Sequence, residues 1–230
     1  MNLQKYFENR KSFFDSEQKF REMCLNCRQP CFNCYCSHIK IFDPGVKFVI
    51  LTHPIEVRRR IATGRMSHLC LKNSELIVGH DYSRNQKVNA LLANPEFHSV
   101  ILYPGRHSLN ISKWTNDEKQ NLVPSQKKLA IFVIDGTWNT ARKMLHLSEN
   151  LKQLPQICFT PSRLSTFRVR KQPAPECVST IEAIHQCIGL LDLSNEHDQL
   201  LEVFDQLVEQ QLVFVERANS RHTKRNRRSA

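Results

Sequence analysis

The stretch Ile131-Phe-Val-Ile-Asp135-Gly-Thr137-Trp138-Asn-Thr-Ala-Arg-Lys-Met144 decides the fold class of this chain. Its apolar, β-branched beginning predicts a buried strand that ends near Asp135, and Thr137 is a suitable start for a helix that runs to Leu147. In an open α/β sheet, ligands bind in the crevice at the carboxyl ends of the strands. Asp135, the glycine after it and Trp138 are therefore expected at a ligand site.

Strands and helices alternate along the rest of the chain. Short apolar runs predict the strands, and two capping boxes, Ser83–Gln86 and Ser179–Glu182, predict helix starts. The expected strands are 47–51, 76–78, 99–103, 129–134 and 156–159, and the expected helices are 83–93, 137–147, 179–193 and 196–215. Such alternation predicts an α/β fold, a mainly parallel sheet with helices on both faces.

The common nucleotide-binding and hydrolase motifs are absent. The chain has only six glycines and contains no GxGxxG, P-loop, HExxH or GxSxG sequence. A nucleotide-like ligand would therefore have to be held by loops that are not glycine-rich. Three such loops are available, at residues 102–105, 134–138 and 170–183.

Five of the nine cysteines lie within thirteen residues, from Cys24 to Cys36. The amino terminus has no apolar run of the kind that forms a secretory signal, so we expect a cytoplasmic protein with free thiols. The pairs Cys24-x-x-Cys27 and Cys34-x-Cys36 have spacings suited to a four-thiolate zinc site, which is closed and therefore structural. Cys31 is left as a competing ligand or a free thiol, and a metal-free set or an iron–sulfur cluster are the alternatives.

The net charge of +11 favours a polyanionic partner such as nucleic acid. Solvated surface clusters would produce the same composition. The candidates for RNA contact are one cluster just after the first expected strand and one group before the last expected capping box: Arg58, Arg59, Arg60, Arg168, Arg170 and Lys171. No apolar run is long enough to span a membrane.

These features divide the chain into three parts. Residues 1–40 form an N-terminal segment with the cysteine-rich loop, residues 41–216 form the α/β domain, and residues 217–230 form a basic C-terminal tail. The tail contains six cations, Arg217, Arg221, Lys224, Arg225, Arg227 and Arg228.

The sequence Asp135-x-Thr137-Trp138 followed by Ala-Arg-Lys-Met144 resembles the signature of the DTW-domain proteins, the tRNA-uridine aminocarboxypropyltransferases. The resemblance extends over most of the chain and includes Arg21, the four paired cysteines, Pro30, Thr52 to Arg58, Thr63-Gly64 and the three loops named above. It implies a transferase that moves the 3-amino-3-carboxypropyl group of S-adenosylmethionine to N3 of a tRNA uridine and leaves methylthioadenosine. It also relates the fold to the knotted SPOUT methyltransferases.

The resemblance implies a set of residues that contact the co-substrate: Tyr103, Pro104, Gly105, Asp135, Thr137, Trp138, Ser179 and Thr180. Asp135 is the candidate base for the N3 proton, a role that requires burial to raise its pKa above the ordinary value of about 3.9. The alternative role for the same carboxylate is to hold the ammonium of the transferred group or to offset the sulfonium of the co-substrate. Trp138 is suited either to the core or to stacking on a ligand.

Two other functions are compatible with the same sequence. A SPOUT-like RNA methyltransferase would use the same loops but direct the methyl group toward the base. A non-catalytic, zinc-containing RNA-binding protein would use only the cysteine loop and the basic tail, and would leave the segment from Asp135 to Trp138 unexplained.

Overall fold

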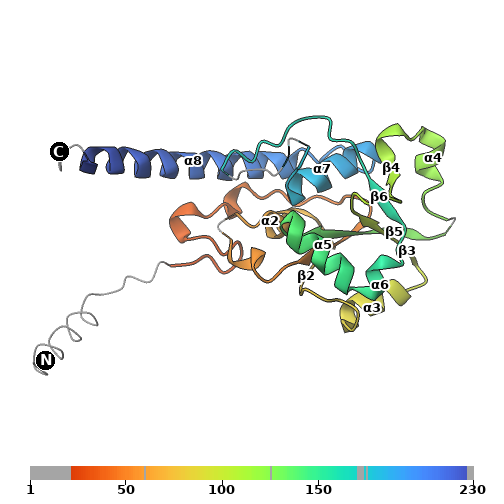
Figure 1. Ribbon diagram of the computed structural model, residues 1–230. Coiled ribbons are helices and arrows are strands. Elements are labelled where there is room, and N and C mark those ends of the chain that lie inside the picture. The colour runs from red at the N-terminus through yellow and green to blue at the C-terminus, as the bar shows by residue number, and fades with distance from the viewer. Residues whose placement is uncertain (1–21, 60, 125, 170–173, 175, 227–230) are drawn as a thin grey trace, which may run out of the picture.

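Six parallel strands form one sheet at the centre of the molecule (Figure 1). The computed structural model describes residues 22–59, 61–124, 126–169, 174 and 176–226, with side chains described as far as Val213. The strands are β1 (Lys47–Thr52), β2 (Glu75–Val78), β3 (Phe97–Leu102), β4 (Leu109–Asn110), β5 (Lys128–Asp135) and β6 (Gln156–Cys158). Their order is β2-β1-β5-β3-β6-β4, so the strand that ends in Asp135 is central.

The five expected strands and the parallel sheet are confirmed, with ends that differ by at most two residues. Strand β4 was missed because it has only two residues and pairs only with β6, which leaves no periodic pattern to read. The knotted, SPOUT-like character of the fold stays a prediction.

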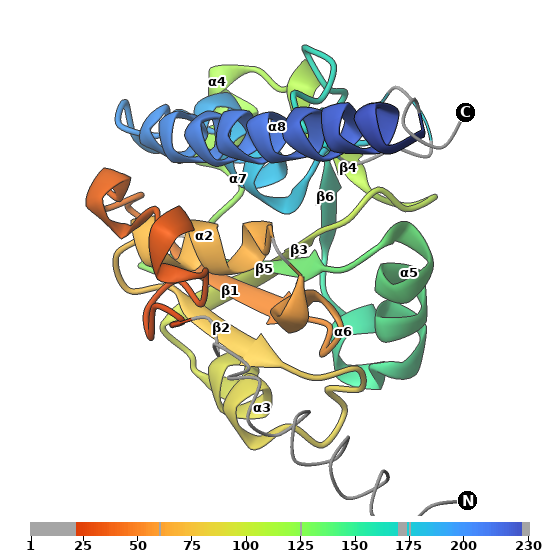
Figure 2. The same ribbon diagram turned by 90° about the vertical axis from the view of Figure 1, so that its left-hand side faces the viewer.

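Helices cover both faces of the sheet, as predicted. Figure 2 shows α2 (Thr63–Cys70), α7 (Thr180–Leu190) and α8 (Gln199–Asn226) on one face, and α3 (Gln86–Ala93), α5 (Trp138–Leu147) and α6 (Glu149–Lys152) on the other. A short helix, α4 (Asn116–Gln120), follows β4. Among the described helices, none has the length and apolar character needed to cross a membrane.

The strands supply two separate cores because successive side chains point to opposite faces. Phe48 and Ile50 of β1 belong to the larger cluster, which includes the buried faces of α2, α7 and α8. Val49 and Leu51 belong to the smaller cluster, which contains Met144 of α5. Strands buried on both faces read as continuous apolar runs, which explains the sequence of β1 and β5.

Several helix ends differ from the prediction. The expected capping box at Ser83 is wrong: Asn85 is the N-cap of α3, and its side-chain oxygen accepts a hydrogen bond from Val88 N–H at 3.1 Å. Ser83 Oγ instead donates to Asp81 Oδ1 at 2.7 Å. Helix α7 ends three residues early because Asp192 adopts a left-handed conformation with φ 53°.

The last helix is longer than predicted. It begins at Gln199 and continues to Asn226, so much of the expected basic tail is helical, and Figure 1 shows it projecting past the sheet. Arg and Lys are good helix formers, and the segment contains no Pro or Gly that would stop a helix. Helices α2 and α4 were not predicted, because they are short and weakly periodic.

Candidate functional site

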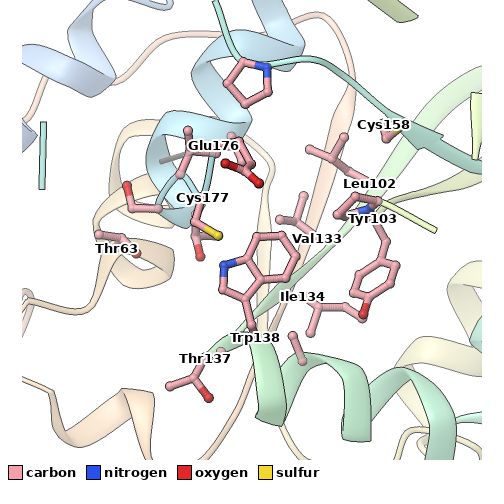
Figure 3. A pocket seen from close by; sticks show the side chains of 18 of the residues that line it. Thr63, Leu102, Tyr103, Val133, Ile134, Thr137, Trp138, Cys158, Glu176 and Cys177 are labelled. Atoms are coloured by element: carbon pink, nitrogen blue, oxygen red, sulfur yellow. The ribbon is translucent and has the colours of Figure 1, made fainter. Parts of the chain in front are cut away.

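A cavity of about 570 Å³ lies at the carboxyl ends of β3, β5 and β6 (Figure 3). Its size is within the range of small-molecule sites. Most of its walls are apolar. It is lined by Thr63, Leu102, Tyr103, Pro104, Val133, Ile134, Gly136, Thr137, Trp138, Ala141, Cys158, Phe159, Pro161, Phe167, Glu176, Cys177, Val178, Ser179, Thr180 and Ala183.

The turn after β5 places Thr137 and Trp138 in this wall. Gly136 is required there, since a Cβ on it would lie 2.7 Å from Thr140 Oγ1. Thr137 caps α5 by accepting a hydrogen bond from Thr140 N–H at 3.2 Å. The half-buried Trp138 ring belongs to neither core cluster and lies between the strand ends and the loop that carries Cys177 (Figure 3). Its position favours contact with a ligand over a core role.

The loop after β3 contributes Tyr103 and Pro104 but not Gly105. The Gly105 N–H donates to Ser108 Oγ at 2.8 Å, and Ser108 Oγ donates to Tyr103 O at 2.7 Å. Gly105 therefore shapes the loop from outside the cavity lining. A Cβ at this position would lie 2.4 Å from Gln156 Oε1, so a larger residue would displace the Gln156 side chain.

Asp135 lies behind the cavity wall, not on it. Its side chain is 3% exposed, and Thr180 Oγ1 donates to its Oδ1 at 2.7 Å. The carboxylate also lies against Gly64, where a Cβ would be 2.3 Å from Oδ2. Asp135 thus joins the end of β5 to the first turns of α2 and α7. This geometry fits a residue that positions the site, and its role as a base stays a prediction.

Glu182 organises the wall formed by the start of α7. The predicted capping box is confirmed: Ser179 N–H and Oγ donate to Glu182 Oε2 at 2.7 and 2.6 Å. The same buried carboxylate accepts from Ser165 Oγ at 2.8 Å and from Thr166 N–H at 2.7 Å. It therefore ties the loop before Phe167 to the helix, in addition to capping it.

Several cavity residues were not predicted from the sequence. Cys158 and Phe159 follow from the rule that named the other loops, because they end the fifth expected strand. Thr63 belongs to the Thr63-Gly64 match to the family, from which no ligand contact was predicted, and Phe167 lies in a loop without a ligand-binding pattern. Glu176 precedes the last expected capping box and had no signal of its own.

The cysteine loop brings four thiols together. The Sγ atoms of Cys24, Cys27, Cys34 and Cys36 lie within 4.8 Å of one another, with 3.7 Å between Cys24 and Cys36 and 3.6 Å between Cys27 and Cys34. A tetrahedral ion with zinc–sulfur bonds of about 2.3 Å separates its ligands by roughly 3.8 Å. Cys31 is exposed and outside the group. The four predicted residues therefore fit a metal site without it.

The four thiols differ in acidity. The backbone N–H groups of Cys27 and Asn26 lower the pKa of the Cys24 thiol to about 6. Burial raises the pKa of Cys27 to about 12 and also raises the pKa of Cys36. Buried thiols of this kind become thiolates when a metal ion compensates the charge.

Helix α2 connects the cysteine loop to the cavity. Cys27 and Tyr35 are buried in the same cluster as Cys70, at the C-terminal end of α2. Thr63, at the other end of α2, lines the cavity. The two regions are therefore supported by one eight-residue helix.

The predicted RNA-contacting residues are only partly described. Arg58, Arg59 and Arg168 are exposed, and Arg59 Nε lies 3.7 Å from Glu56 Oε1. Arg60, Arg170 and Lys171 lie outside the described residues, as does Arg21. Their contact with RNA stays a prediction.

The parallel sheet, the cavity and the four-cysteine loop define an α/β protein with a cavity of small-molecule size and a separate group of four thiols that could hold a metal ion. The chain belongs to the DTW-domain family, whose model matches residues 21–212.

The chain is similar to several proteins that are named as tRNA-uridine aminocarboxypropyltransferases. The chain is 28% identical over 160 residues to tRNA-uridine aminocarboxypropyltransferase 2 of Drosophila melanogaster, covering 67% of this chain and 60% of the relative. It is 27% identical over 148 residues to the mouse protein of the same name, covering 64% and 48%. It is 24% identical over 183 residues to tRNA-uridine aminocarboxypropyltransferase A of Arabidopsis thaliana, covering 70% and 69%. The chain thus spans about half to three fifths of the first two relatives. No solved structure matches it.

Proposed function

We propose that this chain transfers the 3-amino-3-carboxypropyl group of S-adenosylmethionine to N3 of a uridine in tRNA and releases methylthioadenosine. The observation that carries the proposal is the cavity in which the three family loops meet at one edge of the sheet. The names of the relatives supply the reaction and the substrate class.

The reaction forms one bond and breaks one. Uridine N3 attacks the chain carbon next to sulfur, the sulfur–carbon bond breaks, and its electron pair turns the sulfonium into the neutral thioether of methylthioadenosine. The N3 proton is lost to a base. Because the methyl carbon is also attached to sulfur, the outcome depends on which carbon is held in line with N3. Shape and orientation are therefore the main catalytic contributions of the cavity.

The residues of the cavity suit the parts of S-adenosylmethionine. The amino termini of α5 and α7 open at the cavity through Thr137 and Thr180, and such termini favour an anionic group such as the amino acid carboxylate. The Trp138 ring offers an aromatic face for the adenine or for the positive sulfur. The apolar walls exclude water, which protects the orientation of the reacting atoms.

Asp135 acts in this proposal through Thr180 and the two helix starts. If it positions these groups, Asp135→Asn and Thr180→Val should raise the concentration of co-substrate needed for half-maximal rate by similar factors. If Asp135 removes the proton, Asp135→Asn alone should lower the maximal rate and flatten its dependence on pH.

The cysteine cluster holds zinc in this proposal. Four thiolates close the coordination sphere, so the ion supplies folding energy and no reactive position. The net charge of +11 and the exposed Arg58, Arg59 and Arg168 support tRNA as the partner. The described cysteines form no disulfide, which supports a reducing, cytoplasmic location.

The test uses unmodified tRNA and two preparations of S-adenosylmethionine, labelled either in the aminobutyrate chain or in the methyl group. We expect only the chain label to reach tRNA, together with one equivalent of methylthioadenosine. Transfer of the methyl label would replace the proposal with methylation. Binding of tRNA without transfer of either label would identify a binding protein.

A further inference from the structure

Glu176 is the one acidic residue among the described residues that line the cavity, and none of those residues is Lys, Arg or His. Behind the wall lies a second carboxylate, Asp135, which is bound by Thr180. The described part of the lining is thus negative in charge, although the whole chain is strongly positive.

The position of Glu176 relates it to the start of α7. It precedes the N-cap residue Ser179 by three positions, and Figure 3 shows its carboxylate directed toward the space over the Trp138 ring. A carboxylate next to apolar walls and an aromatic face is suited to a cationic ligand, which both groups attract. A ligand carboxylate at the α7 terminus would place a neighbouring cationic group close to Glu176.

We propose that Glu176 binds the α-ammonium of S-adenosylmethionine and so distinguishes the charged co-substrate from the neutral by-product. This inference rests on the proposed function. The α-carbon carries the ammonium and the carboxylate together, so Glu176 and the α7 terminus would hold opposite charges of one zwitterion.

The ammonium is the better partner than the sulfonium for a mechanistic reason. The sulfonium loses its charge as the sulfur–carbon bond breaks, so a carboxylate beside it would stabilise the ground state more than the transition state. The ammonium keeps its charge throughout and leaves on the modified base. Methylthioadenosine has neither the ammonium nor the sulfonium, so Glu176 should not slow its dissociation.

The experiment measures the dissociation constants of three ligands by titration calorimetry at one ionic strength, for the wild type and for Glu176→Gln. S-adenosylmethionine carries both cations, S-adenosylhomocysteine carries only the ammonium, and methylthioadenosine carries neither. Glu176→Gln should weaken the binding of the first two by the same factor, roughly 2-fold to 5-fold, because Glu176 is an exposed residue. It should leave methylthioadenosine unchanged.

Two variants serve as controls. Glu176→Asp keeps the charge and should recover part of the affinity for both charged ligands. Glu96→Gln removes the same charge from the turn before β3. This turn lies at the amino end of the strand, away from the cavity at the carboxyl ends, so the change should alter no affinity. Equal weakening of all three ligands would show a structural role and overturn the inference, as would weakening of S-adenosylmethionine alone or of none. A wild type that does not bind S-adenosylmethionine at all would overturn the proposed function instead.

Discussion

The cysteine loop and the cavity are two sites built in opposite ways. The four thiols come from thirteen consecutive residues, so their spacing alone predicts which side chains meet. The cavity takes its lining from five segments between Thr63 and Ala183, and only the order of strands in the sheet brings them together. A local site can be read from spacing, whereas a distributed site requires the topology or a resemblance.

The two sites also differ in the interactions that stabilise them. Apart from its packing on α2, the loop depends on the ion that we propose for it. The cavity depends on buried polar contacts, Asp135 with Thr180 and Glu182 with three residues. Changes to the loop should therefore alter stability and metal content, and changes to the cavity should alter ligand affinity.

The largest effect is expected for Cys27→Ser, which removes a buried ligand of the proposed zinc ion. Structural zinc contributes roughly 10 kcal/mol to the folding of small zinc domains, so we expect a loss of about 5 kcal/mol or more. Metal content should fall from one ion per chain toward none, measured by atomic emission. Cys31→Ser, a change of the same kind outside the cluster, should keep the ion. Equal metal content in both variants would contradict the four-cysteine assignment.

Glu182→Gln should have the next largest effect. The buried carboxylate accepts five hydrogen bonds, and the NH₂ group of a glutamine side chain would face some of these donors with a donor of its own. We expect a loss of about 3 kcal/mol in the free energy of unfolding, measured with urea, and weaker binding of S-adenosylmethionine.

The matched control is Glu118→Gln, which alters an exposed capping box at the start of α4. It should lose only about 1 kcal/mol and keep the full affinity. Similar losses in the two variants would mean that Glu182 is no more than a cap.

Gly64→Ala tests the contact between α2 and Asp135. The added Cβ would lie 2.3 Å from Asp135 Oδ2, so one of them must move, at a cost of about 2 kcal/mol. The affinity for S-adenosylmethionine should fall, because Thr180 is bound to the displaced carboxylate.

Gly189→Ala is the matched change in α7. Its Cβ would meet only the ring of His197 at 3.0 Å, so stability should change by less than about 1 kcal/mol. If Gly64→Ala leaves the affinity for S-adenosylmethionine unchanged, the position of Asp135 does not influence ligand binding.

The same contrast explains what could be predicted from the sequence. The central strand up to Asp135, the N-cap at Thr137 and the capping box at Ser179 each follow from a few adjacent residues, and all three are confirmed. The four-thiol group was also predicted from adjacent residues. In contrast, the contact of Gly64 with Asp135 joins positions seventy-one apart, and the burial of Glu182 by Ser165 and Thr166 depends on the path of a loop. No local pattern contains such information.

The N-cap of α3 was predicted wrongly because Ser83 and Asn85 are both good N-cap residues, and only the packing of the helix selects between them.

The smallest expected effect is a dependence of stability on pH that arises in α2, between the two sites. Burial, with a further contribution from the charge of Arg65, lowers the pKa of His68 in the folded protein. Below a pH of about 6.5, His68 is protonated in the unfolded chain but stays neutral in the folded protein. The free energy of unfolding therefore falls as the pH drops, until the pKa of His68 in the folded protein is reached. Above a pH of about 6.5, His68 is neutral in both states and does not affect how the free energy of unfolding depends on pH.

His68→Gln should reduce the slope of unfolding free energy against pH on the acid side and leave the slope at pH 7 to 8 unchanged, as measured by urea unfolding at a series of pH values. Part of the slope should remain, because burial also lowers the pKa of His98 and His185. If the variant keeps the full acid slope, the destabilisation comes from those two histidines and α2 is not its source.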